Sequence, residues 1–354
     1  MMKLLLFCLI IFALPALAGT SNVIFILTKF TDTAAENFTQ QAAQDEVNAT
    51  VSFFAEASYG RQLLSATVTP WLVAQMPTSP NCDLSAVSIA ADAAAVAAGY
   101  VLSRYERRYY VMAPSGRCGF EGMTDQAPPY RIWNNGQNSR RVYSHELGHS
   151  FGLMHAGRVA KPGPAQGVDE YGDWYSAMGA TYLSHFNAVQ KAKLGWILPT
   201  EVATFNGKAA AGTTATYTLT PLEKAGGATY AVKISTPSFQ RTYWVEYRQA
   251  LGVDAYVAQV SGAAPGVQIR LSPPFESPSW RTDSQVFDTG AGHRQALPVG
   301  STYVDSYGIS VKVLSADATQ ARVQVTTSGL AVIPTTTGLT AAPNPSAAGQ
   351  RIVY

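Results

Sequence analysis

Apolar positions in the first half of the chain follow two different periods. Residues 22–30, with a continuous apolar run from Val23 to Leu27, are typical of a buried strand, whereas apolar residues recur at helical spacing over residues 36–58. The run of Ala, Val and Ile over residues 85–99 predicts a second helix, which Gly99 ends. Further strands are predicted over residues 63–73, 108–113 and 130–133. This alternation of strands and helices favours an α/β (α+β) layered fold over an all-β one.

The second half of the chain has the period of β-strands. Apolar and polar residues alternate, with turn residues between the segments, over residues 215–219, 230–234, 243–248, 267–271, 309–313 and 322–325. Because helical spacing is nearly absent there, residues 200–328 are predicted to form a β-rich, sandwich-like C-terminal domain. Residues 329–354 are rich in Thr, Pro, Ala and Gly and are predicted to be a linker or a disordered tail.

The amino terminus has the pattern of a secretory signal peptide. Lys3 precedes an apolar run over residues 4–14, and Pro15 and small residues follow up to Ala18. The run is short for a membrane span and cleavage is expected after Ala18, so residues 1–18 are assigned to the signal. The alternative is a membrane anchor that is retained. We therefore expect a secreted, extracellular product with no stable membrane insertion after signal cleavage.

Composition narrows the class of partner. Charged residues make up 14% of the chain, the net charge is +2, and the basic residues form no run. Proteins that bind nucleic acid are typically more basic, so no nucleic-acid partner is expected. A low charge with abundant Ala, Thr, Ser, Gly and Tyr fits an extracellular protein instead.

One short segment carries candidate chemistry. The sequence YSHELGHSFGLMHA contains His145, Glu146, His149, Gly152 and His155 in the pattern H-E-x-x-H-x-x-G-x-x-H. Residues four apart lie on one face of a helix, so His145 and His149 can bind one zinc ion while Glu146 points beside it as a general base. A catalytic zinc needs a third protein ligand and an open position. Gly152 can take a backbone conformation that ends the helix and brings His155 to the ion.

Two other interpretations of this segment were weighed. The histidines can be ordinary residues of an amphipathic helix, although three of the five histidines of the chain fall within the segment. The metal can also be purely structural, but such a site usually closes its fourth position with another ligand, whereas Glu146 suits a base. His185 and His293 lack ligand spacing and are expected to be surface or hydrogen-bonded residues; a place in the substrate cleft stays open for His185.

Cysteine usage fits an oxidising compartment. Of the three cysteines, Cys8 leaves with the predicted signal peptide, so Cys82 and Cys118 remain. They are predicted to form one disulfide, which closes a loop of roughly 35 residues and contributes about 3–4 kcal/mol. The alternative is that one of them ligates the metal as a free thiolate and keeps an enzyme latent.

With this motif the chain resembles the metzincin metalloproteases, and within them the gametolysin-like peptidases. Metzincins carry a methionine-containing turn after the third histidine, and residues 173–179 (DWYSAMG), called the Met-turn below, match it. The resemblance implies that Met178 forms an apolar floor beneath the three histidines. The segments that resemble the gametolysin-like group, and that extend the resemblance over most of the chain, are residues 58–60, 186–196, 243–248 and 266–270.

The resemblance also implies an architecture. It predicts a metzincin-type catalytic domain over residues 19–199, with a twisted mixed sheet and an active-site helix. The cleft is expected between an upper part (residues 20–151) and a lower part (residues 152–198), with the substrate extended along an edge strand. Residues 119–133 are the candidate for the upper rim, held by the predicted disulfide.

The chain departs from family patterns in two places. No propeptide is expected between Ala18 and the first strand, so latency through a propeptide cysteine is not expected. Ala180 stands where some metzincins carry a tyrosine as an additional metal ligand, and neither Tyr175 nor Tyr182 is assigned to the metal.

These features predict a secreted zinc-dependent metalloendopeptidase that hydrolyses internal peptide bonds of extracellular or cell-wall proteins. Zinc activates the attacking water, and Glu146 takes its proton and passes it to the leaving amine. The expected partner is a protein or glycoprotein substrate bound extended in the cleft, and the enzyme is expected to be a monomer. The alternatives are an exported surface- or matrix-binding protein with little proteolytic activity and a zinc hydrolase acting on another bond. The β-rich domain is a candidate for surface targeting.

Overall fold

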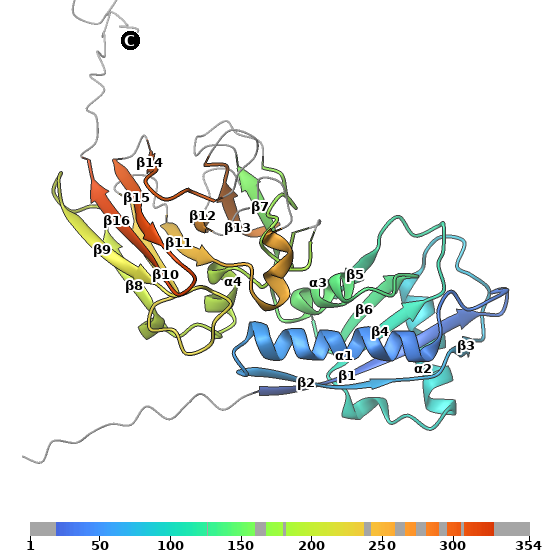
Figure 1. Cartoon of the computed structure of the whole chain (residues 1–354). Coiled ribbons are helices and arrows are strands. Elements are labelled where there is room, and N and C mark those ends of the chain that lie inside the picture. The colour runs from blue at the N-terminus through green and yellow to red at the C-terminus, as the bar shows by residue number, and fades with distance from the viewer. Residues whose placement is uncertain are drawn as a thin grey trace, which may run out of the picture.

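A computed structural model describes residues 19–125, 127–159, 168–179, 182–236, 242–258, 266–273, 281–289, 296–305 and 308–328. The predicted signal peptide (residues 1–18), Ala180, His293 and the predicted tail (residues 329–354) lie outside these residues. The architecture is mixed α/β, with several sheets and few helices (Figure 1). Within the described part of the chain, no helix is long and apolar enough to cross a membrane.

The N-terminal region, residues 19–150, is built on a six-stranded sheet of order β2-β1-β4-β6-β5, with β3 also paired to β1. The pairings are parallel except that of β5 with β6, which makes β5 an antiparallel edge strand. The strands are β1 (Gly19–Phe30), β2 (Gln62–Val68), β3 (Leu72–Ala74), β4 (Arg107–Met112), β5 (Gly122–Thr124) and β6 (Tyr130–Asn135).

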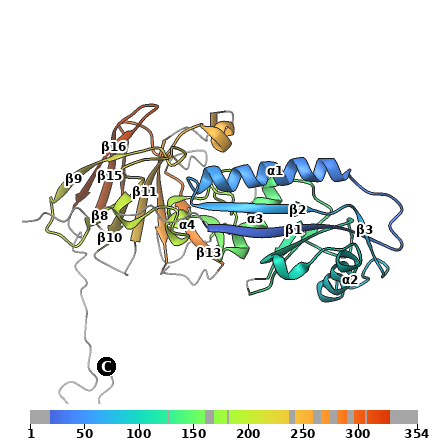
Figure 2. The same ribbon diagram turned by 90° about the horizontal axis from the view of Figure 1, so that it is seen from below.

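Helices cover both faces of this sheet. Helices α1 and α3 lie on one face and α2 lies on the other (Figure 2). Side chains of β1 alternate between the faces, so Val23 and Phe25 join the core on the α1 and α3 side, whereas Ile24 joins the core on the α2 side. Burial on both faces explains the continuous apolar run in this part of the sequence. The helices are α1 (Gln40–Ala57), α2 (Leu84–Ala97) and α3 (Arg140–Ser150), and a 3-10 turn spans Leu102–Arg104.

One predicted strand of this region, residues 63–73, is two strands in the structure. Both β2 and β3 pair in parallel with β1, and the break between them contains Pro70. Proline has no N–H to donate to a neighbouring strand, so the ladder is interrupted there. The first helix also begins later than predicted, at Gln40, because the Thr39 hydroxyl accepts a hydrogen bond from the N–H of Ala42 and caps the helix.

The described chain after α3 contains two further sheets, built from β7 and from strands of residues 200–328, which are called the C-terminal region below. One has the order β7-β13-β12-β11-β10-β8 and the other the order β14-β15-β16-β9. Apolar side chains of both sheets, among them Val245 and Val323, belong to one core. The strands are β7 (His155–Val159), β8 (Val202–Asn206), β9 (Thr214–Leu219), β10 (Ala231–Ser235), β11 (Thr242–Arg248), β12 (Gly266–Ser272), β13 (Thr282–Phe287), β14 (Thr302–Val304), β15 (Ile309–Ala316) and β16 (Ala321–Thr327).

Little helix occurs after α3, in keeping with the sequence pattern of residues 200–328. Among the described residues after α3, the one α-helix is α4 (Ala188–Lys193), whose capping box joins Asn187 and Gln190. Two 3-10 segments follow, at Pro199–Glu201 and Gly252–Ala258.

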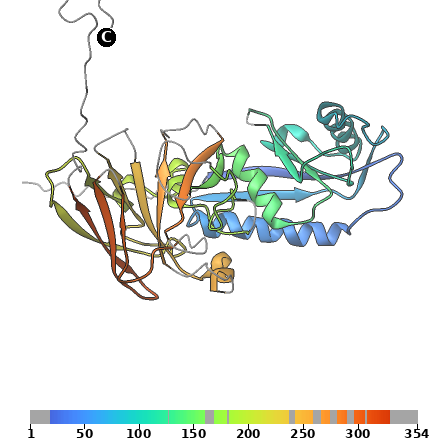
Figure 3. The ribbon, with the colours of Figure 1, turned by 90° about the horizontal axis from the view of Figure 1, so that it is seen from above.

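Strand β7 links the two regions. It precedes the predicted domain boundary at residue 199, yet it pairs in parallel with β13, which follows that boundary. Backbone hydrogen bonds therefore cross the predicted division, and the division itself stays a prediction. Seen from above, helix α3, in green, lies at the junction of the two regions (Figure 3). The candidate site lies at this junction.

The structure contains the disulfide between Cys82 and Cys118, with Cα atoms 5.2 Å apart. It ties the segment before α2 to the segment before β5. Cys118 also packs against the apolar core on the α2 side of the sheet. Because both cysteines are bonded to each other, neither is a free thiolate for a metal.

Candidate metal centre

Helix α3 supplies the first two histidines. Most of its residues are buried, including His145 and Glu146, and the helix ends at Ser150. Gly152 follows with a φ of +90°, a left-handed conformation that favours glycine. The chain then turns back, and β7 begins at His155.

The three histidine rings face one another, with the ring centroids of His145 and His149 4.8 Å apart. Each ring uses its Nδ1 atom for a hydrogen bond, which leaves Nε2 for a metal. The ligand atoms of the three lie within 4.8 Å of one another. The Nδ1 partners are the carbonyl of Ala177 for His145 (2.9 Å), the carbonyl of Leu153 for His149 (2.8 Å) and the carboxylate of Glu170 for His155 (2.5 Å).

These residues fit a zinc ion. Three imidazoles with an open fourth position are a donor set of catalytic zinc sites. Burial lowers the pKa of all three histidines, to about 4 for His149, so the rings are neutral at neutral pH. A neutral imidazole binds a metal without first losing a proton. The Nδ1 hydrogen bonds also fix the orientation of each ring.

Glu146 lies beside the histidines and is itself buried. Burial raises the pKa of its carboxyl group to about 7, while the Thr124 hydroxyl, which donates a hydrogen bond to Oε2 at 2.7 Å, opposes this rise. A base with a pKa near neutrality is well matched to proton transfer at neutral pH. Gly122 makes room for this carboxyl, because a Cβ at Gly122 would stand 2.5 Å from Glu146 Cγ.

The Met-turn passes beneath the helix. Met178 is fully buried, and a Cβ at Gly148 would stand 2.5 Å from its sulfur atom, so the side chain lies directly against α3. The carbonyl of Met178 accepts a hydrogen bond from the N–H of Ala156, next to the third histidine. The turn therefore contacts both the helix and the start of β7.

A cavity of about 350 Å³ opens beside the histidines. Helix α3 and the edge strand β5 line it together with residues that follow the motif. The ring of Tyr171 lies over His155 with centroids 4.1 Å apart, and this tyrosine is 40% exposed. A guanidinium nitrogen of Arg281 lies 3.6 Å from a carboxylate oxygen of Glu170, and both residues line the same cavity. An adjoining cavity of about 310 Å³ runs along Gly119 to Gly122.

Sequence reasoning missed four residues of this site: Thr124, Glu170, Tyr171 and Arg281. They stand at no fixed spacing from the histidine motif, and Thr124 and Arg281 are far from it in the chain. A weak signal exists for Glu170 and Tyr171, because they lie in the stretch that connects His155 to the Met-turn. That stretch has to pass close to the metal.

His185 is not part of the histidine group. It is fully buried, with Nε2 2.9 Å from a carboxylate oxygen of Glu56 and Nδ1 3.1 Å from Nζ of Lys191. Burial, together with the charge of Lys191, lowers its pKa. His185 was expected to be a surface or hydrogen-bonded residue, and it is hydrogen-bonded. It lines neither cavity beside the metal ligands.

Comparison with known proteins relates the chain to metallopeptidases. The model of the family "Gametolysin peptidase M11" matches residues 13–260. No curated protein matches the chain. Among solved structures, one titled "Structure of a chaperone-substrate complex" is 19% identical with a TM-score of 0.33, over 49% of this chain and 30% of that one. Metalloproteinase-II from Bacteroides fragilis is 15% identical with a TM-score of 0.31, over 51% of this chain and 54% of that one. At TM-scores below 0.5, neither likeness bears on the function.

Proposed function

Because the chain belongs to the gametolysin peptidase M11 family, a family of metallopeptidases, we propose that it is a secreted zinc-dependent metalloendopeptidase that cleaves internal peptide bonds of extracellular or cell-wall proteins. The predicted resemblance to gametolysin-like peptidases is confirmed by the family match. The proposal includes a metzincin-type catalytic part followed by a sandwich-like β-rich part. One observation carries it: three histidines converge beside a buried glutamate at an open cavity.

His145, His149 and His155 are the proposed ligands, each through Nε2. When bound, zinc supplies Lewis-acid chemistry, lowering the pKa of a water molecule and polarising the scissile carbonyl. Met178 packs against α3 at Gly148, and its proposed role is an apolar floor beneath the ligands. Among the described residues, no other group of His, Cys, Asp or Glu side chains is arranged to hold a metal ion.

Glu146 is the proposed general base. Its carboxyl group takes a proton from the attacking water and returns it to the nitrogen of the leaving amine. The pKa of about 7 suits both steps, because the group can accept and release a proton near neutral pH. The hydrogen bond from Thr124, a residue of β5, holds the carboxyl group in one orientation against that strand, beside the histidines.

The proposed substrate is an extended polypeptide that adds to the free edge of β5. Among the described strands it pairs with β6 alone, on one side, and it borders the cavity that contains the histidines. An edge strand offers unpaired backbone groups to an extended peptide. The rim formed by residues 119–122 follows Cys118, so the disulfide steadies it. We propose that the enzyme acts as a monomer.

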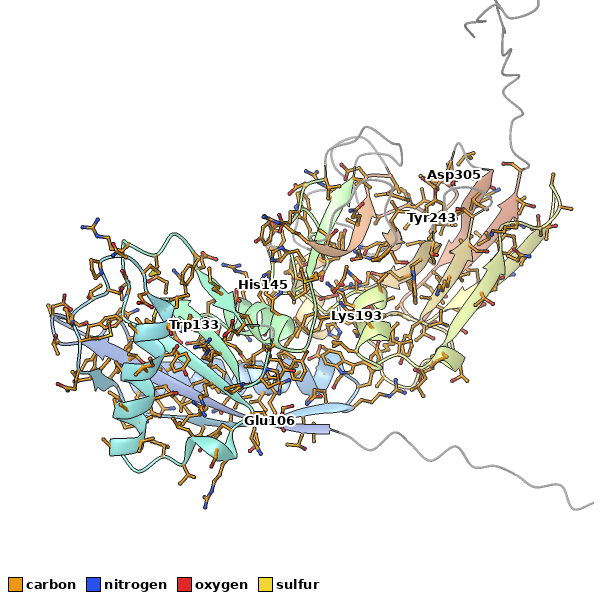
Figure 4. All side chains as sticks on the ribbon, turned by 180° about the vertical axis from the view of Figure 1, so that it is seen from behind. Glu106, Trp133, His145, Lys193, Tyr243 and Asp305 are labelled. Atoms are coloured by element: carbon orange, nitrogen blue, oxygen red, sulfur yellow. A yellow bond between two sulfur atoms is a disulfide. The ribbon has the colours of Figure 1, made fainter. Side chains whose placement is uncertain are left out.

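The test is the variant Glu146→Gln in the purified protein. We expect casein cleavage to fall about 10²–10⁴-fold while one zinc ion is still bound, because the amide cannot take a proton. The matched control is Glu106→Gln, a carboxylate that is 52% exposed, pairs with Arg107 and lies apart from His145 (Figure 4). Equal cleavage by both variants would contradict the role of Glu146.

The metal is tested separately. Removal of zinc with a chelator should abolish casein cleavage, and added zinc should restore it with one ion per chain by elemental analysis. If cleavage persists in the chelator after the ion is gone, the protein is not a metalloendopeptidase of the proposed kind.

A further inference from the structure

The Met-turn meets the C-terminal region through buried charges. Arg270 on β12 forms an ion pair with Asp173 of the turn, and its Nε lies 2.9 Å from a carboxylate oxygen of Glu246 on β11. All three side chains are fully buried. A second arginine of the region, Arg248, donates a hydrogen bond to the carbonyl of Tyr175 in the turn at 2.8 Å.

Asp173 connects Arg270 to the turn that contacts the metal ligands. Its other carboxylate oxygen accepts a hydrogen bond from the N–H of Tyr175 at 2.9 Å, so the side chain that binds Arg270 also shapes the turn. The carbonyl of Ala177, at the far side of the same turn, accepts the hydrogen bond from His145 Nδ1. A series of contacts through the Met-turn therefore leads from Arg270 to His145.

The third ligand is attached to the C-terminal region more directly. The N–H of His155 donates to the carbonyl of Arg281 at 3.0 Å, and β7, which begins at this histidine, pairs with β13. The preceding N–H, that of Met154, donates to a carboxylate oxygen of Asp283 at 2.6 Å. Lys193 on α4 pairs with the other oxygen of Asp283 at 2.6 Å.

We propose that the β-rich C-terminal region is a component of the metal centre, with Arg270 and Asp283 as positioning residues for His145 and His155. This inference rests on the proposed metallopeptidase function and deepens it. Ion pairs and charge-assisted hydrogen bonds are directional, so they hold a turn and a ligand at set positions in a way that apolar contact does not. A buried charge that loses its partner is also strongly unfavourable, so the interface adopts one arrangement.

The proposal differs from a role in surface targeting, the other expectation for this region. A separable targeting module can change without effect on the metal. A component of the metal centre cannot, because the ligands depend on its contacts. Zinc affinity of the otherwise folded protein distinguishes the two roles.

The experiment uses a matched pair of buried carboxylates in the full chain. Asp283 accepts a backbone N–H next to His155, whereas Asp305 accepts the N–H of Ile309 at 2.7 Å and the hydroxyl of Tyr243 at 2.6 Å. Tyr243 and Asp305 lie together in the β-rich region, well away from His145 (Figure 4). The variants Asp283→Ala and Asp305→Ala thus remove similar contacts at different distances from the metal. Arg270→Lys, which keeps the charge but loses the planar fork of the guanidinium, is the third variant.

The measured quantity is the zinc dissociation constant of the metal-free protein, by competition with a chromogenic chelator. We expect Asp283→Ala and Arg270→Lys to weaken zinc binding about tenfold or more, because Asp283 holds the residue before His155 and Arg270 holds the turn whose Ala177 carbonyl orients His145. Asp305→Ala should change the zinc dissociation constant less than about threefold. Its melting temperature in EDTA should still fall, as that of Asp283→Ala does, because each variant loses buried hydrogen bonds. Similar zinc affinities in all three variants would overturn the proposal.

Two further measurements separate the possible failures. If wild-type protein binds no zinc, the proposed function fails. If wild type binds zinc and cleaves casein, but the zinc affinity of the variants is unaltered, this inference alone is overturned. If an alanine variant does not fold in EDTA, Asp283→Asn is measured against Asp305→Asn with the same expected order.

Discussion

Two regions hold the proposed metal ligands, and they do so by different interactions. His145 and His149 lie on α3, whose buried Tyr143 and Leu147 belong to an apolar core shared with α1 and β1. β7 and the Met-turn add Ala156 and Met178 to this core, and in addition the Met-turn contacts the C-terminal region through buried charges of Asp173, Arg270 and Glu246.

This difference separates the interactions that stabilise the helix from those that orient the other ligand-bearing segments. Apolar packing is not directional and tolerates changes of shape when volume is kept, so it stabilises the helix as a unit. Hydrogen bonds and ion pairs specify angle as well as distance, so they suit the part of the site that arrives from another segment. We therefore expect the N-terminal region to contribute mainly to stability and the contacts of the C-terminal region mainly to the placement of the ligands.

The largest expected effect concerns the stability of the N-terminal region. Replacing both cysteines, Cys82→Ser with Cys118→Ser, should lower the free energy of unfolding by about 3–4 kcal/mol, because the unfolded chain loses a constraint over its long loop. Denaturant unfolding in a chelator measures this effect. The zinc dissociation constant should stay within about twofold of wild type, since the bond touches no ligand. A large loss of zinc affinity would show that the N-terminal region also places the metal.

A smaller effect is expected at the contact behind the third ligand. Glu170→Gln should weaken zinc binding about 10–100-fold, because the carboxylate that orients His155 becomes a neutral amide. The neighbouring variant Asp169→Asn is the control, since that carboxylate pairs with Arg158 and is 50% exposed. Competition with a chromogenic chelator measures both proteins. Equal affinities would mean that Glu170 does not position the ring.

The effect that is smallest per pH unit is a dependence of stability on pH. Burial lowers the pKa of His149 to about 4, whereas an unfolded histidine titrates near the ordinary value of 6.5. Between these values the unfolded state binds more protons, so stability is full above pH 6.5 and is lost as pH falls towards 4. Each such histidine contributes a slope of at most about 1.4 kcal/mol per pH unit.

The variant His149→Gln isolates this contribution. In metal-free protein, its free energy of unfolding should fall less steeply than that of wild type between pH 6.5 and 4.5. The two slopes should agree between pH 7 and 8, where the histidine is neutral in both states. Parallel curves over the acidic range would contradict the lowered pKa.

Much of the fold and the centre of the site follow from local sequence. Strands and helices of the N-terminal region were predicted from the spacing of apolar residues, because a helix and a strand bury faces of different period. The convergence of His145, Glu146 and His149 follows from the same helical period. Short elements such as β5 and β7 escaped prediction, because three to five residues carry too little pattern.

The sequence by itself determined which residues can hold a metal, since fixed offsets on one helix and a glycine after it are local geometry. Only the tertiary structure decided what orients them. Glu170 behind His155, Thr124 behind Glu146 and Arg270 behind the Met-turn are contacts between residues that share no period. They form because separate strands and loops pack at one junction. The spacing of residues along the chain does not predict which distant segments pack together.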